Sequence, residues 1–460
     1  MSKVITHWQP ENPEFWQSTG KQIAKRNLWI SIPALLLAFA IWQVWSVAVV
    51  NLPNIGFKYT ENQLFWLAAL PALSGATLRI FYSFMVPVFG GRKWTTLSTA
   101  SLLLPAIGIG YAVQDPNTSY TTMVILALLC GFGGGNFSSS MSNISFFFPK
   151  AEKGTAMGLN AGLGNLGVSV VQFVVPLIIT AGVFGVLGGE AQTWTKGDVT
   201  KQMWLQNAGF IWVPFIILSA ITAWFGMNDL ADAKASFKEQ SVIFSRKHNW
   251  IMCIIYLGTF GSFLGFAAGF ALLTKSQFSG IDPVKYAFVG PLVSALARPV
   301  GGMWADKIKS GAKVTQLVFI GMIISVIGVL SFLPTNGQGG NFWGFFACFV
   351  ALFILTGLGN GSTFMQIPLI FASVHQKMAK AGLETEDQAR LSANKESAAV
   401  AGFTGAFAAY GGFFIPKSYS VSTELTGSVY GAFIGFIVFY AICLALNWWY
   451  YARNGAEAKC

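Results

Sequence analysis

Residues 65–88 read FWLAALPALSGATLRIFYSFMVPV, an apolar run with a single arginine, Arg79, inside it. A transmembrane helix needs about 20 mostly apolar residues, so this run predicts a membrane span. A second run, YAFVGPLVSALARPVGGMW at residues 286–304, carries Arg298 in the same way, and neither run contains an Asp or Glu. Arg stays protonated in proteins, and a fixed charge at membrane depth is costly unless it faces a cavity or a partner. We therefore expect both arginines to serve a function, and a small anion is a suitable partner.

The composition of the whole chain is that of a polytopic membrane protein. Only 10% of its 460 residues are charged, and 54% are hydrophobic, whereas soluble domains carry about 25% charged residues. The apolar runs give twelve predicted spans, and the fold class is therefore all-α. Their approximate ranges are 28–51, 63–88, 95–114, 121–148, 154–185, 207–227, 249–275, 283–304, 314–334, 342–372, 396–416 and 427–451.

The longest central polar stretch follows the sixth span and predicts a boundary between two pseudo-symmetric six-helix halves. We predict an N-terminal half of residues 1–227, a cytoplasmic linker of residues 228–249 and a C-terminal half of residues 250–460. A weak repeat supports the division, because residues 135–138 read GNFS in span four and residues 359–362 read GNGS in span ten. The two arginines also fall six spans apart. Two repeats with a binding site at their interface are a known transporter design.

The basic residues outside the spans predict the orientation of the chain in the membrane. Twenty-one of them fall on one side, and only six, such as Lys58 and Lys196, fall on the other. The positive-inside rule places the richer side, with both termini, in the cytoplasm. The net charge of +11 therefore reflects topology, and it is not evidence for nucleic-acid binding.

The depth of the two arginines predicts a shared cavity. Arg79 lies 11 residues before Gly90, which is about 16 Å along a helix, and half a hydrocarbon core is about 15 Å. Arg298 lies eight residues before Asp306, or about 12 Å. Similar depths in equivalent helices favour one central site. The alternative is that each arginine snorkels to the interface or bonds backbone carbonyls.

The positions of the acidic residues restrict the classes of substrate that we expect. All 18 Asp and Glu residues lie in loops, termini or span ends, so a carboxylate proton relay inside the membrane has no obvious candidate. A cationic substrate would be repelled by the two arginines. The planar donor fork of Arg matches planar or bidentate oxyanions better than Lys does, which favours a small oxyanion.

Further lining residues are predicted from their chemistry. Asn165 in the Gly-rich span five and Tyr256 in span seven can donate hydrogen bonds to an anion, and Phe137 and Phe260 can form apolar walls that exclude water. Ordinary packing is the alternative for each. Glycines in spans five and eleven permit close helix approach. These are Gly158, Gly162, Gly164, Gly167, Gly402, Gly405, Gly411 and Gly412.

Other site chemistries find little support in the sequence. The five cysteines form no CxxC pair, and the three histidines lie outside the predicted spans, which argues against metal and disulfide sites. No nucleophile is grouped with a base. We therefore expect no enzyme activity, no cofactor and no metal.

Taken together, these residues resemble the nitrate/nitrite porters of the major facilitator superfamily, specifically the bacterial nitrate–nitrite carriers, over essentially the whole chain. The most specific resemblance lies in residues 158–167, GLNAGLGNLG, and residues 401–413, AGFTGAFAAYGGF, which look like the paired nitrate signature motifs. The resemblance implies that Arg79 and Arg298 bind the substrate, that Asn165 and Tyr256 are polar contacts, and that Phe137 and Phe260 clamp the anion.

One cytoplasmic motif of the superfamily departs from its usual form. After span eight it is recognisable from Gly302 to Asp306 and continues to Gly311. After span two only Gly90-Gly-Arg-Lys93 remains, without the Asp. The contacts between spans two and three are therefore expected to differ from those of the family.

The expected function is transport of nitrate and nitrite by alternating access in the bacterial inner membrane, in nitrate/nitrite antiport and as a monomer. Occluding an empty site would bury two cations without compensation, which is costly, so the carrier should switch only when loaded. The alternatives are proton-coupled nitrate symport and a carrier or channel for another small anion. A membrane sensor is disfavoured because no cytoplasmic domain is large enough for signalling.

Overall fold

The structure, a computed structural model, describes residues 4–231, 241–335 and 339–460. The chain forms two compact units. The first comprises Met1–Lys234, Ala267–Ser276 and Asp282–Phe288, and the second comprises Ala235–Phe266, Gln277–Ile281 and Val289–Cys460. The predicted boundaries at residues 228 and 249 stay predictions, and residues 232–240 of the predicted linker lie outside the described residues.

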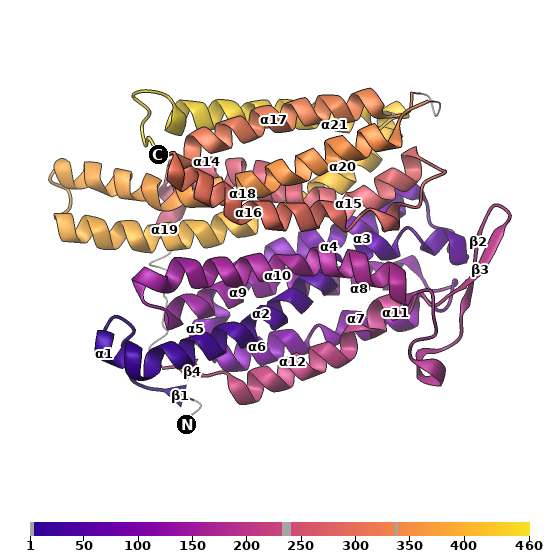
Figure 1. The fold of residues 1–460 in the computed structure, drawn as a ribbon, viewed down its shortest axis with the longest axis horizontal. Coiled ribbons are helices and arrows are strands. Elements are labelled where there is room, and N and C mark those ends of the chain that lie inside the picture. The colour runs from indigo at the N-terminus through magenta and orange to yellow at the C-terminus, as the bar shows by residue number, and fades with distance from the viewer. Residues whose placement is uncertain (1–3, 232–240, 336–338) are drawn as a thin grey trace. The chain divides into compact units, whose positions relative to one another are not determined.

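The first unit is built mainly from helices, shown in indigo to magenta in Figure 1. Its α-helices are α1 (Pro13–Phe15), α2 (Lys21–Gln43), α3 (Trp45–Ala48), α4 (Glu61–Tyr82), α5 (Met85–Phe89), α6 (Gly91–Ala100), α7 (Leu103–Ala112), α8 (Tyr120–Leu129), α9 (Gly131–Phe147), α10 (Lys150–Ile178), α11 (Asn207–Phe210) and α12 (Trp212–Gly226). The shorter turns are η1 (Trp16–Gly20), η2 (Leu52–Ile55) and η3 (Gly185–Gly188).

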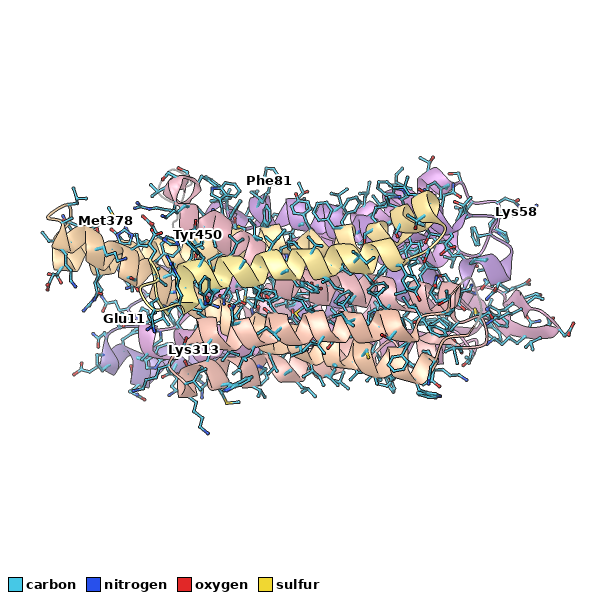
Figure 2. The ribbon with its side chains drawn as sticks, turned by 90° about the horizontal axis from the view of Figure 1, so that it is seen from above. Glu11, Lys58, Phe81, Lys313, Met378 and Tyr450 are labelled. Atoms are coloured by element: carbon cyan, nitrogen blue, oxygen red, sulfur yellow. The ribbon has the colours of Figure 1, made fainter. Side chains whose placement is uncertain are left out.

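The first predicted span begins as its sequence indicates. Asn12 accepts hydrogen bonds from the backbone N–H groups of Glu14 and Phe15, and Pro13 takes the first helical position, which is a favourable start for a helix. The helix then continues through η1 into α2 without leaving the helical region. Glu11 and Lys58, which flank this first span, lie at opposite ends of the unit in Figure 2.

Two small sheets complete the first unit. Strand β1 (Val4–Ile5) pairs in parallel with β4 (Asp229–Leu230), so the start of the chain lies beside the end of α12. Strands β2 (Gln192–Lys196) and β3 (Val199–Met203) form an antiparallel hairpin between α10 and α11, with Trp194 opposite Lys201.

Later segments of the chain also pack into the first unit. Gln172 of α10 donates hydrogen bonds to Ser46 Oγ at 3.0 Å and to the Ala267 carbonyl at 2.8 Å. Ser169 Oγ donates to the Phe288 carbonyl at 3.0 Å. These bonds join the two short segments that contain Ala267 and Phe288 to α10.

The second unit is also helical, and its elements run from magenta to yellow in Figure 1. They are η4 (Ser241–Ser245), α14 (Lys247–Tyr256), η5 (Leu257–Gly261), the start of α15 (Ser262–Gln277), α16 (Val289–Lys307), α17 (Gly311–Phe332), α18 (Phe342–Lys380), α19 (Glu386–Ala409), α20 (Gly411–Thr426), α21 (Tyr430–Asn447) and η7 (Trp448–Ala452). The turn η6 (Pro283–Lys285) belongs to the first unit.

Helices α18 and α19 form a hairpin that extends past the ends of α17 and α21 (Figure 1). Figure 2 shows Met378 near the tip of this hairpin, beyond Tyr450 and Lys313. At its base, Glu396 of α19 accepts two hydrogen bonds from Arg246, at 2.9 and 2.8 Å. His375 of α18 lies between Glu384 and Glu396, 2.9 and 3.4 Å away. The ion pair between Arg246 and Glu396 joins the hairpin to the start of α14.

The predicted membrane fold is confirmed. Eleven segments of the described residues are long and apolar enough to cross a membrane, and α16 is the twelfth spanning helix expected from the sequence. It contains Arg298, Asp306 and Lys307 within its 19 residues, and these charges lower its mean hydropathy. The protein is therefore a multi-pass, all-α membrane protein.

Candidate functional site

Arg79 lies in the last turn of α4 and is fully buried. Its Nε donates a hydrogen bond to the Gly134 carbonyl of α9 at 2.9 Å. Its guanidinium carbon lies 4.6 Å from the ring centre of Phe137 and 4.9 Å from that of Trp42. One nitrogen of Arg79 thus bonds a backbone carbonyl, while two aromatic faces stabilise the charge by cation–π attraction.

Small residues let α4 and α9 approach closely enough for this contact. A Cβ at Gly134 would lie 2.7 Å from Gly75 Cα, and a Cβ at Gly75 would lie 2.5 Å from Trp42 Nε1. No side chain fits between the helices at this point. Trp42 is itself fixed by a 2.6 Å hydrogen bond from its Nε1 to the Pro71 carbonyl. The Arg79 side chain therefore emerges from a tightly packed crossing, which holds it in one position.

Asn165 and the glycines of α10 occupy two different environments. Gly164 and Gly167 contact α2, since a Cβ would lie 2.6 Å from Leu35 Cδ2 at the first and 2.1 Å from the Leu36 carbonyl oxygen at the second. A Cβ at Gly158 or Gly162 would meet no atom within 4 Å. Asn165 is 2% exposed, and its Oδ1 makes no hydrogen bond among the described residues. Gly164 and Gly167 therefore let α10 pack on α2, whereas Gly158 and Gly162 border open space.

Arg298 lies in α16 and is half-buried. Its guanidinium carbon lies 5.9 Å from the ring centre of Phe364 in α18. Its Nη1 is buried and makes no hydrogen bond within the part of the chain that the structure describes. A Cβ at Gly361 would lie 2.1 Å from the Arg298 carbonyl oxygen. As in the first unit, glycine permits a close crossing beside an arginine whose charge lies near an aromatic ring.

Tyr256, at the end of α14, is 2% exposed and donates a hydrogen bond from its hydroxyl to Asn360 Oδ1 at 2.5 Å. Its ring stacks on Phe260 with centroids 5.3 Å apart and lies 6.2 Å from Phe364. The second unit thus brings three predicted residues, Arg298, Tyr256 and Phe260, into a chain of contacts through Phe364.

The glycines of the second signature segment also divide by environment. Gly411, at the start of α20, packs on η5, where its Cβ would lie 2.4 Å from Gly261 Cα. Gly405 and Gly412 are buried, whereas a Cβ at Gly402 would meet no atom within 4 Å. Packing therefore accounts for Gly411 and leaves Gly402 beside open space.

The first unit brings Phe137 beside Arg79, and the second connects Tyr256 and Phe260 to Arg298 through Phe364, whereas no hydrogen bond joins Asn165 Oδ1 to Arg79 among the described residues. Several partners of these residues were missed in the sequence. Trp42, Gly134, Asn360 and Phe364 contact the predicted residues directly. Asn360 had a signal, because it occupies the GNGS segment that repeats GNFS. No sequence signal distinguished Phe364 or Trp42, since apolar helices contain many phenylalanines and tryptophans and the sequence does not show which of them lie near an arginine.

Comparisons with known proteins show the family of the chain. The sequence profile of the Major Facilitator Superfamily matches residues 34–416. The chain is 49% identical over 457 residues to "Nitrate/nitrite transporter NarU" of Escherichia coli (strain K12), covering 99% of this chain and 98% of that protein. It is 44% identical over 462 residues to "Probable nitrate/nitrite antiporter NarK2" of Thermus thermophilus, again covering 99% and 98%.

A solved structure supports the fold independently. A bacterial homolog of the human lysosomal transporter Spinster superposes with a TM-score of 0.63, at 13% sequence identity, over 92% of this chain and 96% of that one. At such low identity the likeness speaks for the fold alone.

Proposed function

The chain belongs to the Major Facilitator Superfamily, among its nitrate/nitrite transporters, and from this premise we propose that it exchanges nitrate for nitrite across a bacterial inner membrane. Nitrate and nitrite are its transported substrates, and it is a transporter rather than an enzyme. We also propose that exchange is obligatory and that the predicted residues bind the anion. The carrier works as a monomer surrounded by lipid, and both termini lie in the cytoplasm.

A fixed cation beside an aromatic ring in each unit is the observation that carries the proposal. Arg79 faces Phe137, and Arg298 lies near Phe364 with its Nη1 buried and without a hydrogen bond among the described residues. A planar anion suits each of these surroundings, since its oxygens accept hydrogen bonds from a guanidinium fork and its face can lie against an aromatic ring. Asn165 and Tyr256 are the proposed further polar contacts, and Tyr256 exchanges its hydrogen bond to Asn360 for one to the anion.

Exchange follows from the cost of burying charge. Removing a guanidinium from water without a counter-ion is unfavourable, and a bound anion offsets this cost. In a carrier whose two repeats move around the binding site, the loaded protein then changes conformation more readily than the empty one. Nitrate that enters should therefore be matched by an anion that leaves.

Purified protein in liposomes tests this directly. Liposomes are loaded with nitrite, nitrate, chloride or buffer alone, and uptake of isotopically labelled nitrate is followed with and without a pH gradient. Exchange predicts rapid uptake only against internal nitrite or nitrate, with no effect of the pH gradient. Equal uptake into empty liposomes would contradict exchange, and stimulation by an inward proton gradient would favour proton-coupled symport. Uptake against chloride would indicate a less selective anion carrier.

A further inference from the structure

The loop that joins α4 to α6 receives a carboxylate from another part of the first unit. Residues Gly90-Gly-Arg-Lys93, at the start of α6, contain no acid, whereas the corresponding segment at the end of α16 includes Asp306. In the structure, Asp229 contacts the start of α6 although it lies 137 residues after Arg92 in the chain. It belongs to β4, directly after α12.

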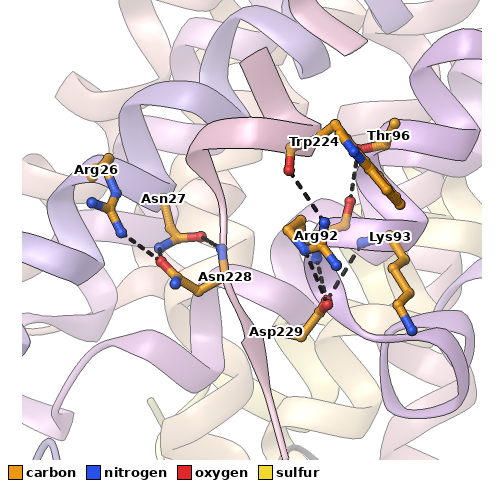
Figure 3. A network of polar contacts seen from close by, with 8 residues as sticks. All are labelled: Arg26, Asn27, Arg92, Lys93, Thr96, Trp224, Asn228 and Asp229. Carbon is orange, nitrogen blue, oxygen red and sulfur yellow. Dashed lines mark hydrogen bonds and ion pairs between the residues drawn. The ribbon is translucent and has the colours of Figure 1, made fainter. Parts of the chain in front are cut away.

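Asp229 makes both capping and ionic contacts with the start of α6. Its Oδ1 accepts hydrogen bonds from the backbone N–H groups of Arg92 at 2.8 Å and Lys93 at 3.4 Å. Its Oδ2 lies 3.2 Å from Arg92 Nε. Arg92 in turn donates to the Trp224 carbonyl at 3.2 Å and lies 4.5 Å from the Trp224 ring centre. Figure 3 shows Arg92 and Lys93 in contact with the carboxylate, and Trp224 in contact with Arg92. A negative charge at a helix N-terminus also interacts favourably with the helix dipole.

Glycine residues at the start of α6 leave room for the carboxylate. Gly90 has a φ of +90°, and a Cβ there would lie 2.4 Å from Asp229 Oδ1. At Gly91 a Cβ would lie 1.9 Å from Asn143 Oδ1 of α9. Any side chain at either position would displace a polar group from the start of α6. Asp229 and Arg92 are 6% and 5% exposed, so the pair is a buried, built contact rather than a surface encounter.

The residue before Asp229 ties the same segment to α2. The backbone N–H of Asn228 donates to Asn27 Oδ1 at 2.9 Å, and Asn228 Oδ1 accepts from Arg26 at 2.7 Å and from Asn27 at 3.2 Å (Figure 3). Strand β1 pairs with the same segment on its other side. We call Arg26, Asn27, Arg92, Asn228 and Asp229 the cytoplasmic clasp. Three elements of the first unit, α2, α6 and α12, therefore meet at the point where the chain leaves for residues 232–240.

We propose that Asp229 is a positioning residue for the transport cycle, replacing the acid missing from the α4–α6 loop. This inference rests on the proposed function. Arg79 lies three residues before the end of α4, and the clasped loop follows. Alternating access requires each half to move as one body, and the clasp joins the cytoplasmic ends of three helices and the start of the connecting segment. Its loss should slow conformational turnover and leave anion affinity nearly unchanged.

The test separates the ion pair from the helix cap. Asp229→Asn keeps an oxygen that can accept from the backbone N–H groups but removes the charge, and Arg92→Gln removes the partner. Nitrate/nitrite exchange is measured in liposomes for both variants, for the double variant and for Lys93→Gln, whose side chain is outside the clasp. We expect each single variant to lower the maximal exchange rate about fivefold, with the half-saturating nitrate concentration changed by less than about twofold.

Two further results are expected. The double variant should be no slower than the single variants, because the two groups act as one pair. Trypsin should cleave at Arg92 or Lys93 faster in Asp229→Asn than in the wild type, since the start of α6 is released. Lys93→Gln should exchange at the wild-type rate.

Several outcomes would overturn the proposal. They are an unchanged maximal rate, a raised half-saturating concentration at an unchanged maximal rate, or strictly multiplicative effects in the double variant. Where Asp229→Asn elutes as an aggregate in size-exclusion chromatography, Asp229→Glu and Arg92→Lys take its place, and these conservative variants should retain more of the rate than Arg92→Gln. If the wild type itself shows no exchange, the proposed function fails, and unchanged trypsin cleavage of Asp229→Asn then contradicts the clasp independently.

Discussion

Tyr256 and Asn360 are joined by a 2.5 Å hydrogen bond between the tyrosine hydroxyl and Asn360 Oδ1, and both side chains are 2% exposed. The bond links the end of α14 to the middle of α18, beside the ring of Phe364. The bond holds Tyr256, a predicted substrate contact, in place. Its partner Asn360 belongs to the GNGS segment that repeats GNFS, but the repeat alone does not predict this contact.

The first prediction concerns this pair. Tyr256→Phe leaves Asn360 Oδ1 buried without its partner, which should cost about 1–3 kcal/mol of stability. Asn360→Leu removes the acceptor and should cost a similar amount. The melting temperature of the purified protein in detergent measures both. Because the two groups share one bond, Tyr256→Phe combined with Asn360→Leu should destabilise by less than the sum, and a fully additive loss would contradict the contact.

The second prediction separates the two arginines. Arg79→Lys keeps the charge but loses the planar fork that bonds Gly134 and lies on two aromatic rings, so it should weaken nitrate binding at least about tenfold. Arg298→Lys should weaken binding similarly but cost less stability, because Arg298 is only half-buried. Nitrate binding by calorimetry and melting temperature are the measurements. Arg390→Lys, at an exposed position of α19, is the control and should match the wild type in both.

The third prediction uses the division of the signature glycines. Gly167→Ala places a Cβ 2.1 Å from the Leu36 carbonyl, and such overpacking should destabilise the protein by about 1–3 kcal/mol. Gly162→Ala meets no atom within 4 Å and should melt at or above the wild-type temperature, since Ala favours helix by up to about 1 kcal/mol. If the open face serves the anion, Gly162→Ala should nevertheless slow exchange. Equal melting temperatures for the two variants would contradict the division.

The fourth prediction concerns Glu457, which lies after the last span. Its Oε1 is 2.6 Å from Lys247 Nζ and 3.4 Å from His248 Nε2. Partial burial acts to raise the pKa of Glu457, but the hydrogen bond and charge of Lys247, together with His248, outweigh it and lower the pKa below its usual value. A lowered folded-state pKa stabilises the protein above the unfolded-state pKa, and this contribution is lost as the pH falls through the folded value.

Glu457→Gln should therefore melt below the wild type at pH 7, and the gap should close as the pH falls below about 4. Thermal unfolding in detergent across this range measures the gap. Glu424→Gln, at an exposed position of α20, should melt with the wild type at pH 7. A gap that widens at low pH would mean that the sign of the contribution is wrong.

Much of the fold was predictable because bilayer physics leaves a strong mark on sequence. The twelve spans follow from apolar length, and α16 was recognised even though Arg298 and its terminal charges reduce its mean hydropathy. The continuation of α18 to Lys380 and the start of α19 at Glu386 were less visible. The mixed charges of residues 375–397 favour a solvated connector over a surface helix, and this prediction is wrong, because the segment forms a helical hairpin held by His375 and Arg246.

The candidate site was predictable in its charges and in the ring of Phe137, but not in its other aromatic surroundings. Arg79 and Arg298 stand out because each is a permanent cation in an apolar run. Trp42 and Phe364 do not, since the rotation of each helix about its axis decides which aromatic rings reach the guanidinium groups. Periodicity gives a weak guide to that rotation in helices that are apolar on all sides.

The order of residues along the chain was enough to identify a multi-pass helical carrier with two fixed positive charges in its spans, because length, hydropathy and the protonation of arginine are properties of the residues alone. The packing of the helices was needed to learn which glycines pack against other helices and which face open space. It also showed that Tyr256 bonds Asn360, and that Asp229 accepts a hydrogen bond at the start of α6, 137 residues before it. These relationships depend on the distance and rotation between packed helices. Such distances are set by the close fit of many side chains together and are recorded at no single position in the chain.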